Sequence, residues 1–249
     1  MSNSVEIHPA GSVVPNYSDR SWTASDVVCP FDFAVVPGVD GEAANAELRK
    51  KYLGMTPLIF GSPTRAAGLI QTIKLAIQPD EILKQAASID LDAWLRQRLA
   101  YLRRRAGHSA DPVPPHGQWP AEAAPTTGLC SVVDLHGCIS QQVVIGLLPC
   151  TDCDACAYLR FGGWNACPEP AVHVTIARRW AASHGAILTG CLYDTLEFRV
   201  ARPIVDRDEA MKMAMMHYLY NFETVEQPGS IELAAAALVG STVWQFWWD

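Results

Sequence analysis

The chain has 249 residues, of which 49% are hydrophobic, and a formal net charge of −7 at pH 7. This acidic balance argues against a nucleic-acid-binding protein, because such proteins gather Lys and Arg to neutralise phosphates. The longest apolar run, Ile231–Val239, is about half of the roughly 18–20 residues that span a bilayer, and the N-terminus lacks the basic and apolar regions of a signal peptide. We therefore expect a cytoplasmic protein with neither a membrane nor a nucleic-acid partner.

The first half of the chain alternates between strand-like and helix-like patterns. Ser62 followed by Pro63 is typical of a helix start, because Ser caps free N–H groups and Pro suits the first helical position. Gly54 suits the position after a helix end. Beyond an irregular stretch at 1–25, we expect strands at Val27–Val36 and Thr56–Phe60 and helices at Glu42–Leu53, Pro63–Ala76, Asp80–Ser88 and Leu91–Arg105. This order indicates an N-terminal α/β region over residues 1–128.

Residues 107–128 are the clearest linker in the sequence. Five Pro and two Gly stand between Gly107 and Thr127, with few aliphatic residues and no periodicity. Such a stretch is either a domain boundary or a long surface loop. We place a boundary at its end, with a C-terminal domain over 129–249.

The C-terminal half predicts a further set of elements in an informative order. We expect strands at Ser131–Leu135, Gln141–Leu148, Ala157–Gly163 and Val243–Trp248, a hairpin of Ala186–Tyr193 with Leu196–Ala201, and helices at Val172–His184, Asp206–Asn221 and Ile231–Val239. From residue 157 onwards this is the order of a split βαβ unit. The fold prediction is therefore α+β, with a ferredoxin-like core over 157–249.

Four motifs of this half resemble one uncharacterised bacterial family. They are YLRFGGWNACPEP (Tyr158–Pro170), RRWAASHGA (Arg178–Ala186), D-x-x-E-x-x-V-x-R-P (Asp194–Pro203) and the terminal FWWD. The family is a C-terminal domain of unknown function that ends in Phe-Trp-Trp. The resemblance covers 157–249 and extends more weakly to Gly117–Pro120, and it implies a fold but no established activity.

Cysteines form a second pattern just before these motifs. Cys150, Cys153 and Cys156 are spaced C-x2-C-x2-C, and Cys167 follows. Thiolates at such spacing can bind zinc or an iron–sulfur cluster, but a zinc ribbon uses paired C-x2-C knuckles and a cluster motif has its fourth Cys closer. The alternative is a set of thiols in a connecting loop. The resembling family lacks this cluster, so zinc is only a possible cofactor and we otherwise expect none.

The GGWN motif marks the best binding-site hypothesis. In a ferredoxin-like order, Gly162, Gly163, Trp164 and Asn165 would lie at the same end of the sheet as the turn that carries Asp194, with Glu197 nearby. Two glycines allow a close backbone approach, Trp offers a stacking face, and two carboxylates can serve in acid–base chemistry. The alternative is structural, with the glycines in a bend, Trp164 over the core and Asn165 capping a turn.

The terminal aromatics predict a closing strand and not a frayed tail. Trp247 and Trp248 are large side chains that are ordered only when they are buried or bound. One face of this strand would pack on helices and the other would suit an interface, although burial of both faces is an alternative.

No complete catalytic or cofactor motif is present in the sequence, including Walker A, G-x-S-x-G and G-x-G-x-x-G. The leading functional hypothesis is therefore a cytoplasmic protein-binding module, of a regulatory or immunity type, that blocks or modulates a protein partner. The alternative is a hydrolase-like enzyme with a site around Trp164, Asn165, Asp194 and Glu197.

Overall fold

A computed structural model describes residues 5–15, 27–73, 76–107, 113–134 and 136–248. Its strands form one mixed six-stranded sheet in the order β1-β3-β2-β4-β5-β6. Neighbouring strands are antiparallel, except that β2 runs parallel to β4. The strands are β1 (Asp32–Pro37), β2 (Thr56–Ile59), β3 (Gln142–Leu148), β4 (Ala186–Cys191), β5 (Thr195–Val200) and β6 (Val243–Trp247).

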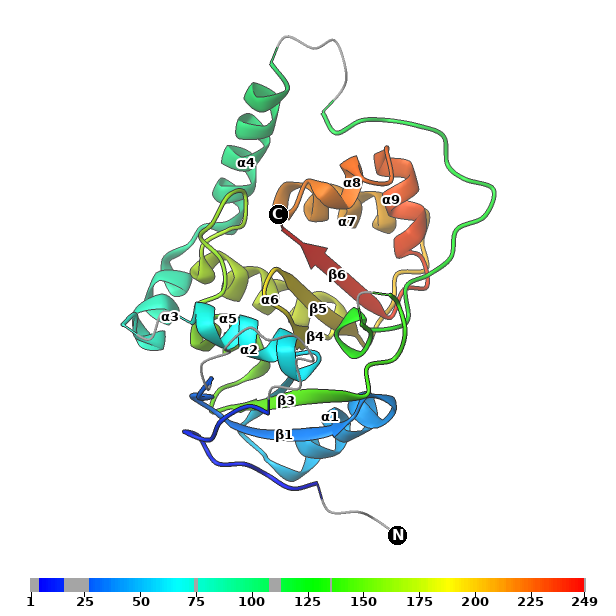
Figure 1. Ribbon diagram of the computed structural model, residues 1–249. Coiled ribbons are helices and arrows are strands. Elements are labelled where there is room, and N and C mark those ends of the chain that lie inside the picture. The colour runs from blue at the N-terminus through cyan, green and yellow to red at the C-terminus, as the bar shows by residue number, and fades with distance from the viewer. Residues whose placement is uncertain (1–4, 16–26, 74–75, 108–112, 135, 249) are drawn as a thin grey trace.

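Helices cover both faces of this sheet (Figure 1). On one face, α1 (Gly41–Lys51) and the 3-10 turn η2 (Cys130–Val132) enclose a smaller core. The other face carries the larger core and the remaining helices: α2 (Pro63–Thr72), α3 (Pro79–Ser88), α4 (Leu91–Ala106), α5 (Ala155–Leu159), α6 (Pro170–His184), α7 (Arg207–Tyr220), α8 (Glu223–Glu226) and α9 (Ile231–Leu238). Two more 3-10 turns are η1 (Gly38–Asp40) and η3 (Asp152–Asp154). The α+β class predicted from the sequence is confirmed.

Local capping chemistry explains where several helices begin and end. The Ser62 hydroxyl accepts from Arg65 N and Pro63 opens α2, as predicted. Asp206 caps α7 in the same way. Gly54, after α1, has φ +85°, a left-handed conformation that favours glycine.

The strand expected at Ala157–Gly163 is wrong. The structure has helix α5 (Ala155–Leu159) there, followed by Arg160 in the left-handed conformation. Tertiary structure explains the difference, because β4 already pairs with β2 and β5 along its two edges and has no edge left for a strand from this segment. The ferredoxin-like order is therefore not formed, and β4, β5 and β6 are instead antiparallel neighbours in chain order.

Smaller differences concern the ends of elements. The segment expected as a strand at Ser131–Leu135 is the turn η2 followed by a single bridge from Val133 to Ile139. Leu135 lies outside the described residues. The first strand begins at Asp32, and not at Val27, and the short helix α8 was not expected.

The sheet combines strands from both sides of the predicted boundary at 128/129. β3, from the C-terminal part, lies between β1 and β2 from the N-terminal part. The boundary at 128/129 stays a prediction, and strands from its two sides are hydrogen-bonded neighbours in one sheet.

The described part of the predicted linker, residues 113–128, is a long surface loop (Figure 1). It is tied to α9, because Ile231 N donates to Pro115 O at 2.9 Å and Gly117 N donates to Glu232 Oε2 at 2.7 Å. Further along, Thr126 O accepts from Val243 N, at the start of β6. No helix in the described part of the chain is long and apolar enough to cross a membrane.

Candidate functional site

The GGWN motif forms a tight loop between α5 and α6. Gly162 and Gly163 have φ +111° and +80°, and Gly163 N donates to Pro168 O at 2.9 Å. A Cβ atom at Gly162 would lie 2.1 Å from Pro168 O and 2.7 Å from His173 Nε2. The backbone at Gly162 therefore lies close to a histidine of α6, whereas a Cβ atom at Gly163 would meet the carboxylate of Glu169.

His173 is fully buried at the centre of this region. Its Nε2 lies 3.5 Å from Cys167 Sγ, and its Nδ1 lies 2.5 Å from Tyr220 Oη. Its ring contacts those of Phe161, Tyr220 and Trp248, with centroids 5.3–5.4 Å apart. The GGWN loop and the terminal Trp motif, far apart in sequence, thus meet at one imidazole.

Burial sets the resting protonation of this pair. It lowers the pKa of His173 to about 3, against a smaller opposite effect of the Pro168 carbonyl. Burial also raises the pKa of the Cys167 thiol far above its usual value, although Arg98 and the Gly163 N–H favour the thiolate. At neutral pH the pair is therefore a thiol beside a neutral imidazole.

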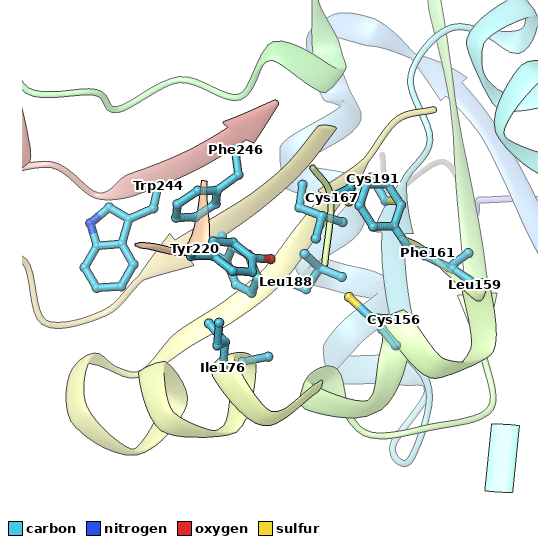
Figure 2. Packing of buried hydrophobic residues seen from close by; sticks show 14 of the residues in the cluster. Cys156, Leu159, Phe161, Cys167, Ile176, Leu188, Cys191, Tyr220, Trp244 and Phe246 are labelled. Carbon is cyan, nitrogen blue, oxygen red and sulfur yellow. The ribbon is translucent and has the colours of Figure 1, made fainter. Parts of the chain in front are cut away.

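The terminal strand has one buried and one more exposed face. Trp244, Phe246 and Trp248 point into the larger core, where Figure 2 shows Phe246 close to Tyr220. Trp247 points the other way and is 37% exposed. The predicted closing strand with one packed face is confirmed. Asp249, the last residue of the FWWD motif, lies outside the described residues.

Trp164, Tyr193 and Trp247 lie around the turn that carries Asp194, and we call these three residues the aromatic surface. The rings of Trp164 and Tyr193 stack with centroids 6.4 Å apart, and Tyr193 is 57% exposed. Trp247 Nε1 donates to Asp194 Oδ2 at 2.9 Å, which ties the terminal strand to the same turn. The structure therefore brings the GGWN motif to the Asp194 turn as expected, although by a loop and not by the end of a strand.

Glu197 does not pair with Asp194. It is fully buried, and its carboxylate accepts from Cys130 N at 2.5 Å and Ser131 N at 3.0 Å. Its contacts hold the turn η2 against β5. Asp194 instead accepts from Thr195 Oγ1 and Trp247 Nε1.

The four cysteines of the zinc hypothesis lie at different depths. Cys150, Cys156 and Cys167 are buried, Cys153 is partly exposed, and all four are free thiols. The described residues hold no group of three or more His, Cys, Asp or Glu side chains that could hold a metal ion. The described part of the chain therefore gives no support to the hypothesis of a zinc site at these cysteines.

A groove of about 330 Å³ lies beside the outer edge of β6. Gln245 and Trp247 border it on the strand side. On the other side it is bordered by α7, α8 and α9, with side chains that include Thr224, Gln227, Ala237 and Leu238.

A second hollow, of about 380 Å³, lies between α4 and the loop before α6. Cys167 lines it together with Arg98, Arg104 and Tyr101. Arg98 Nη2 donates to Ala166 O at 2.8 Å, so α4 is clamped to the loop that carries Cys167.

The Cys167–His173–Tyr220 set was not predicted. The sequence pattern indicated Cys167 only as a metal ligand. The one local signal was the short spacing between a Cys and a His across a helix start at Pro170.

Comparison with known proteins agrees with the resemblance seen in the sequence. Residues 144–249 match the sequence model of a family described as Domain of unknown function (DUF4253). No curated protein and no solved structure matches the chain. The matched residues include most of β3, all of β4 to β6, His173 and both motifs that meet there.

Proposed function

We propose that this protein is a protein-binding module that takes up an extended segment of its partner as an added strand on β6. The observation that carries the proposal is the open outer edge of β6 at Gln245, which faces a groove. Strand addition at an exposed sheet edge is a common mode of peptide recognition.

The hydrogen-bond pattern identifies the open backbone groups. Trp248 N donates to Asp194 O, so the alternate residues Trp244, Phe246 and Trp248 direct their backbone groups toward β5. In an antiparallel ladder the residues between them point theirs away. Val243 N and Trp247 O find partners in Thr126 O and Asn221 Nδ2. The Gln245 N–H and C=O point outward without a protein partner among the described residues.

Charge and shape favour a neutral or basic segment. The groove lining includes Glu223 and neither Lys nor Arg, and the chain has a net charge of −7. A basic segment would gain from this field both in affinity and in association rate.

The aromatic surface lies at the end of the same strand. Trp247 borders the groove and Tyr193 is exposed beside Trp164. Large aromatic side chains contribute much of the affinity at protein interfaces. We therefore assign this surface to the same partner.

The cytoplasm is the proposed location, and blocking or modulating the partner, in a regulatory or immunity role, is the proposed outcome of binding. All eight cysteines are free thiols and five of them are buried, which suits a reducing compartment.

The test is selection of peptides from a displayed library of extended segments. Gln245→Pro removes the outward N–H and spares the ladder to β5, while Gln245→Ala keeps that N–H and serves as the matched control. We expect basic peptides that bind the wild type and Gln245→Ala and bind Gln245→Pro at least about 10-fold more weakly, with slowed hydrogen exchange at the Gln245 amide. Equal binding to both variants, or no enrichment of any peptide, would refute strand addition.

The arrangement of Asp194 and Glu197 does not favour the alternative of a hydrolase-like enzyme. Asp194 and Glu197 are bonded to different groups, and Glu197 is buried in a structural role. Nothing in their arrangement supports acid–base chemistry between them.

A further inference from the structure

We infer that Cys167 is a nucleophile for acyl transfer from small esters or thioesters that carry a carboxylate, with His173 as its general base and Tyr220 as the residue that orients His173. This site is separate from the groove at β6 and adds an activity to the proposed binding function.

The geometry has the three parts that an activated nucleophile needs. Cys167 Sγ lies 3.5 Å from His173 Nε2, and the other ring nitrogen lies 2.5 Å from Tyr220 Oη. When Nδ1–H donates to Tyr220, Nε2 is left with a free lone pair that faces the thiol. Tyr220 Oη can accept from Nδ1–H, and this contact is compatible with the tautomer in which Nε2 accepts the proton of Cys167.

The surroundings of Nε2 also accommodate the charged form of His173. The Pro168 carbonyl lies on the Nε2 side of the ring, since a Cβ atom on Gly162 would approach both atoms closely. This carbonyl stabilises the imidazolium and opposes the strong effect of burial on the pKa of His173. Gly162 permits the arrangement because any larger residue would occupy the space between the loop and the ring.

The hollow beside Cys167 indicates the class of substrate. Two guanidinium groups line it, those of Arg98 and Arg104, against one carboxylate, that of Glu169. Arg98 uses Nε and Nη2 for Leu219 O and Ala166 O, and its Nη1 has no partner among the described residues. An excess of positive charge beside a thiol suits a substrate whose acyl group carries a carboxylate.

The reaction balances without another reagent than water. Cys167 Sγ forms a bond to the acyl carbon while its proton moves to His173 Nε2. The C–O or C–S bond to the leaving group then breaks, and His173 returns the proton to that group. Water next attacks the acyl carbon, His173 takes and returns its proton, and the S–C bond breaks to release a carboxylic acid and the free thiol.

The experiment uses the full chain with mono-4-nitrophenyl succinate and, for comparison, uncharged 4-nitrophenyl acetate. Nitrophenolate release is followed by absorbance, and the acylated residue is located by intact-mass and peptide mass spectrometry. We expect an adduct on Cys167 that is absent in Cys167→Ser and unchanged in Cys138→Ser, a variant of an exposed thiol. His173→Asn should slow acylation about 100-fold or more.

Two further variants separate catalysis from folding. Tyr220→Phe keeps the ring and should slow acylation at an unchanged unfolding midpoint, and Arg104→Gln should remove the preference for the succinate ester by raising its KM. Acylation found on Cys138 or Cys153, an equal rate in His173→Asn, or no adduct on a folded wild-type protein would each overturn the inference.

Discussion

Replacing Trp248 with Ala gives the sharpest test of the packing described above. Trp248 is 3% exposed although it is the penultimate residue, and its ring contacts those of Phe161, His173 and Tyr220. An aromatic side chain of this size buries about 150–250 Å². At about 25 cal/mol per Å², that burial contributes about 4–6 kcal/mol.

Part of this gain is offset by a polar atom. Trp248 Nε1 is buried and has no hydrogen-bond partner in the described structure, which costs about 1–3 kcal/mol. We therefore expect Trp248→Ala to lower the free energy of unfolding by about 3 kcal/mol. This value falls at the lower end of the roughly 3–5 kcal/mol typical of such truncations.

Trp248→Phe is the matched control. It removes the unpartnered N–H but keeps most of the ring contacts, so we expect a loss below about 1.5 kcal/mol. Urea unfolding followed by far-UV circular dichroism measures both. A loss below about 1 kcal/mol in Trp248→Ala, or equal losses in the two variants, would refute the reasoning.

Three further predictions concern glycine, carboxylate and histidine positions. Gly162→Ala should lose about 2–4 kcal/mol of stability, because φ is +111° and the new Cβ would lie 2.1 Å from a carbonyl oxygen. The control Gly68→Ala lies inside α2 with open space around it and should gain up to about 1 kcal/mol. Similar free energies of unfolding for the two variants in urea melts would contradict this prediction. Glu197→Gln should lose about 1–3 kcal/mol, because an amide oxygen replaces two acceptors and its NH2 faces an N–H donor; an unchanged midpoint would exclude the role of Glu197 in holding η2. Burial lowers the pKa of both His173 and His217 to about 3, so the unfolded chain binds more protons below pH about 6.5. Above that pH the two neutral histidines make their full contribution to the free energy of unfolding. On acidification the free energy of unfolding should fall by about 1.4 kcal/mol per pH unit for each histidine. A His173→Asn variant should halve this slope between pH 6 and 5.5, and an unaltered slope would be inconsistent with a buried neutral His173.

The sequence determined those elements whose signals are local. Ser62 and Pro63 start α2, Asp206 caps α7, and the turn at Asp194 closes a hairpin, because each rests on contacts between residues a few positions apart. The aromatic residues at the C-terminus also predicted a closing strand with at least one face packed on helices.

Tertiary structure alone decided the secondary structure of Ala157–Gly163 and which residues make up the candidate site. The segment has strand-like residues, but both edges of β4 are occupied, so it became a helix and a loop. The GGWN motif was correctly predicted to lie near the Asp194 turn. The prediction assumed that the end of a strand would place it there, whereas in the structure a loop does so.

Long-range contacts account for what the sequence did not reveal. His173 and Tyr220 are 47 positions apart, and Glu197 and Cys130 are 67 apart. No local pattern links such pairs, because each residue type is also common in ordinary helices and strands. Only the stacking of α6 and α7 on one face of the sheet placed a thiol, an imidazole and a phenol in contact, and only the position of β6 at the end of the sheet left its outer edge open.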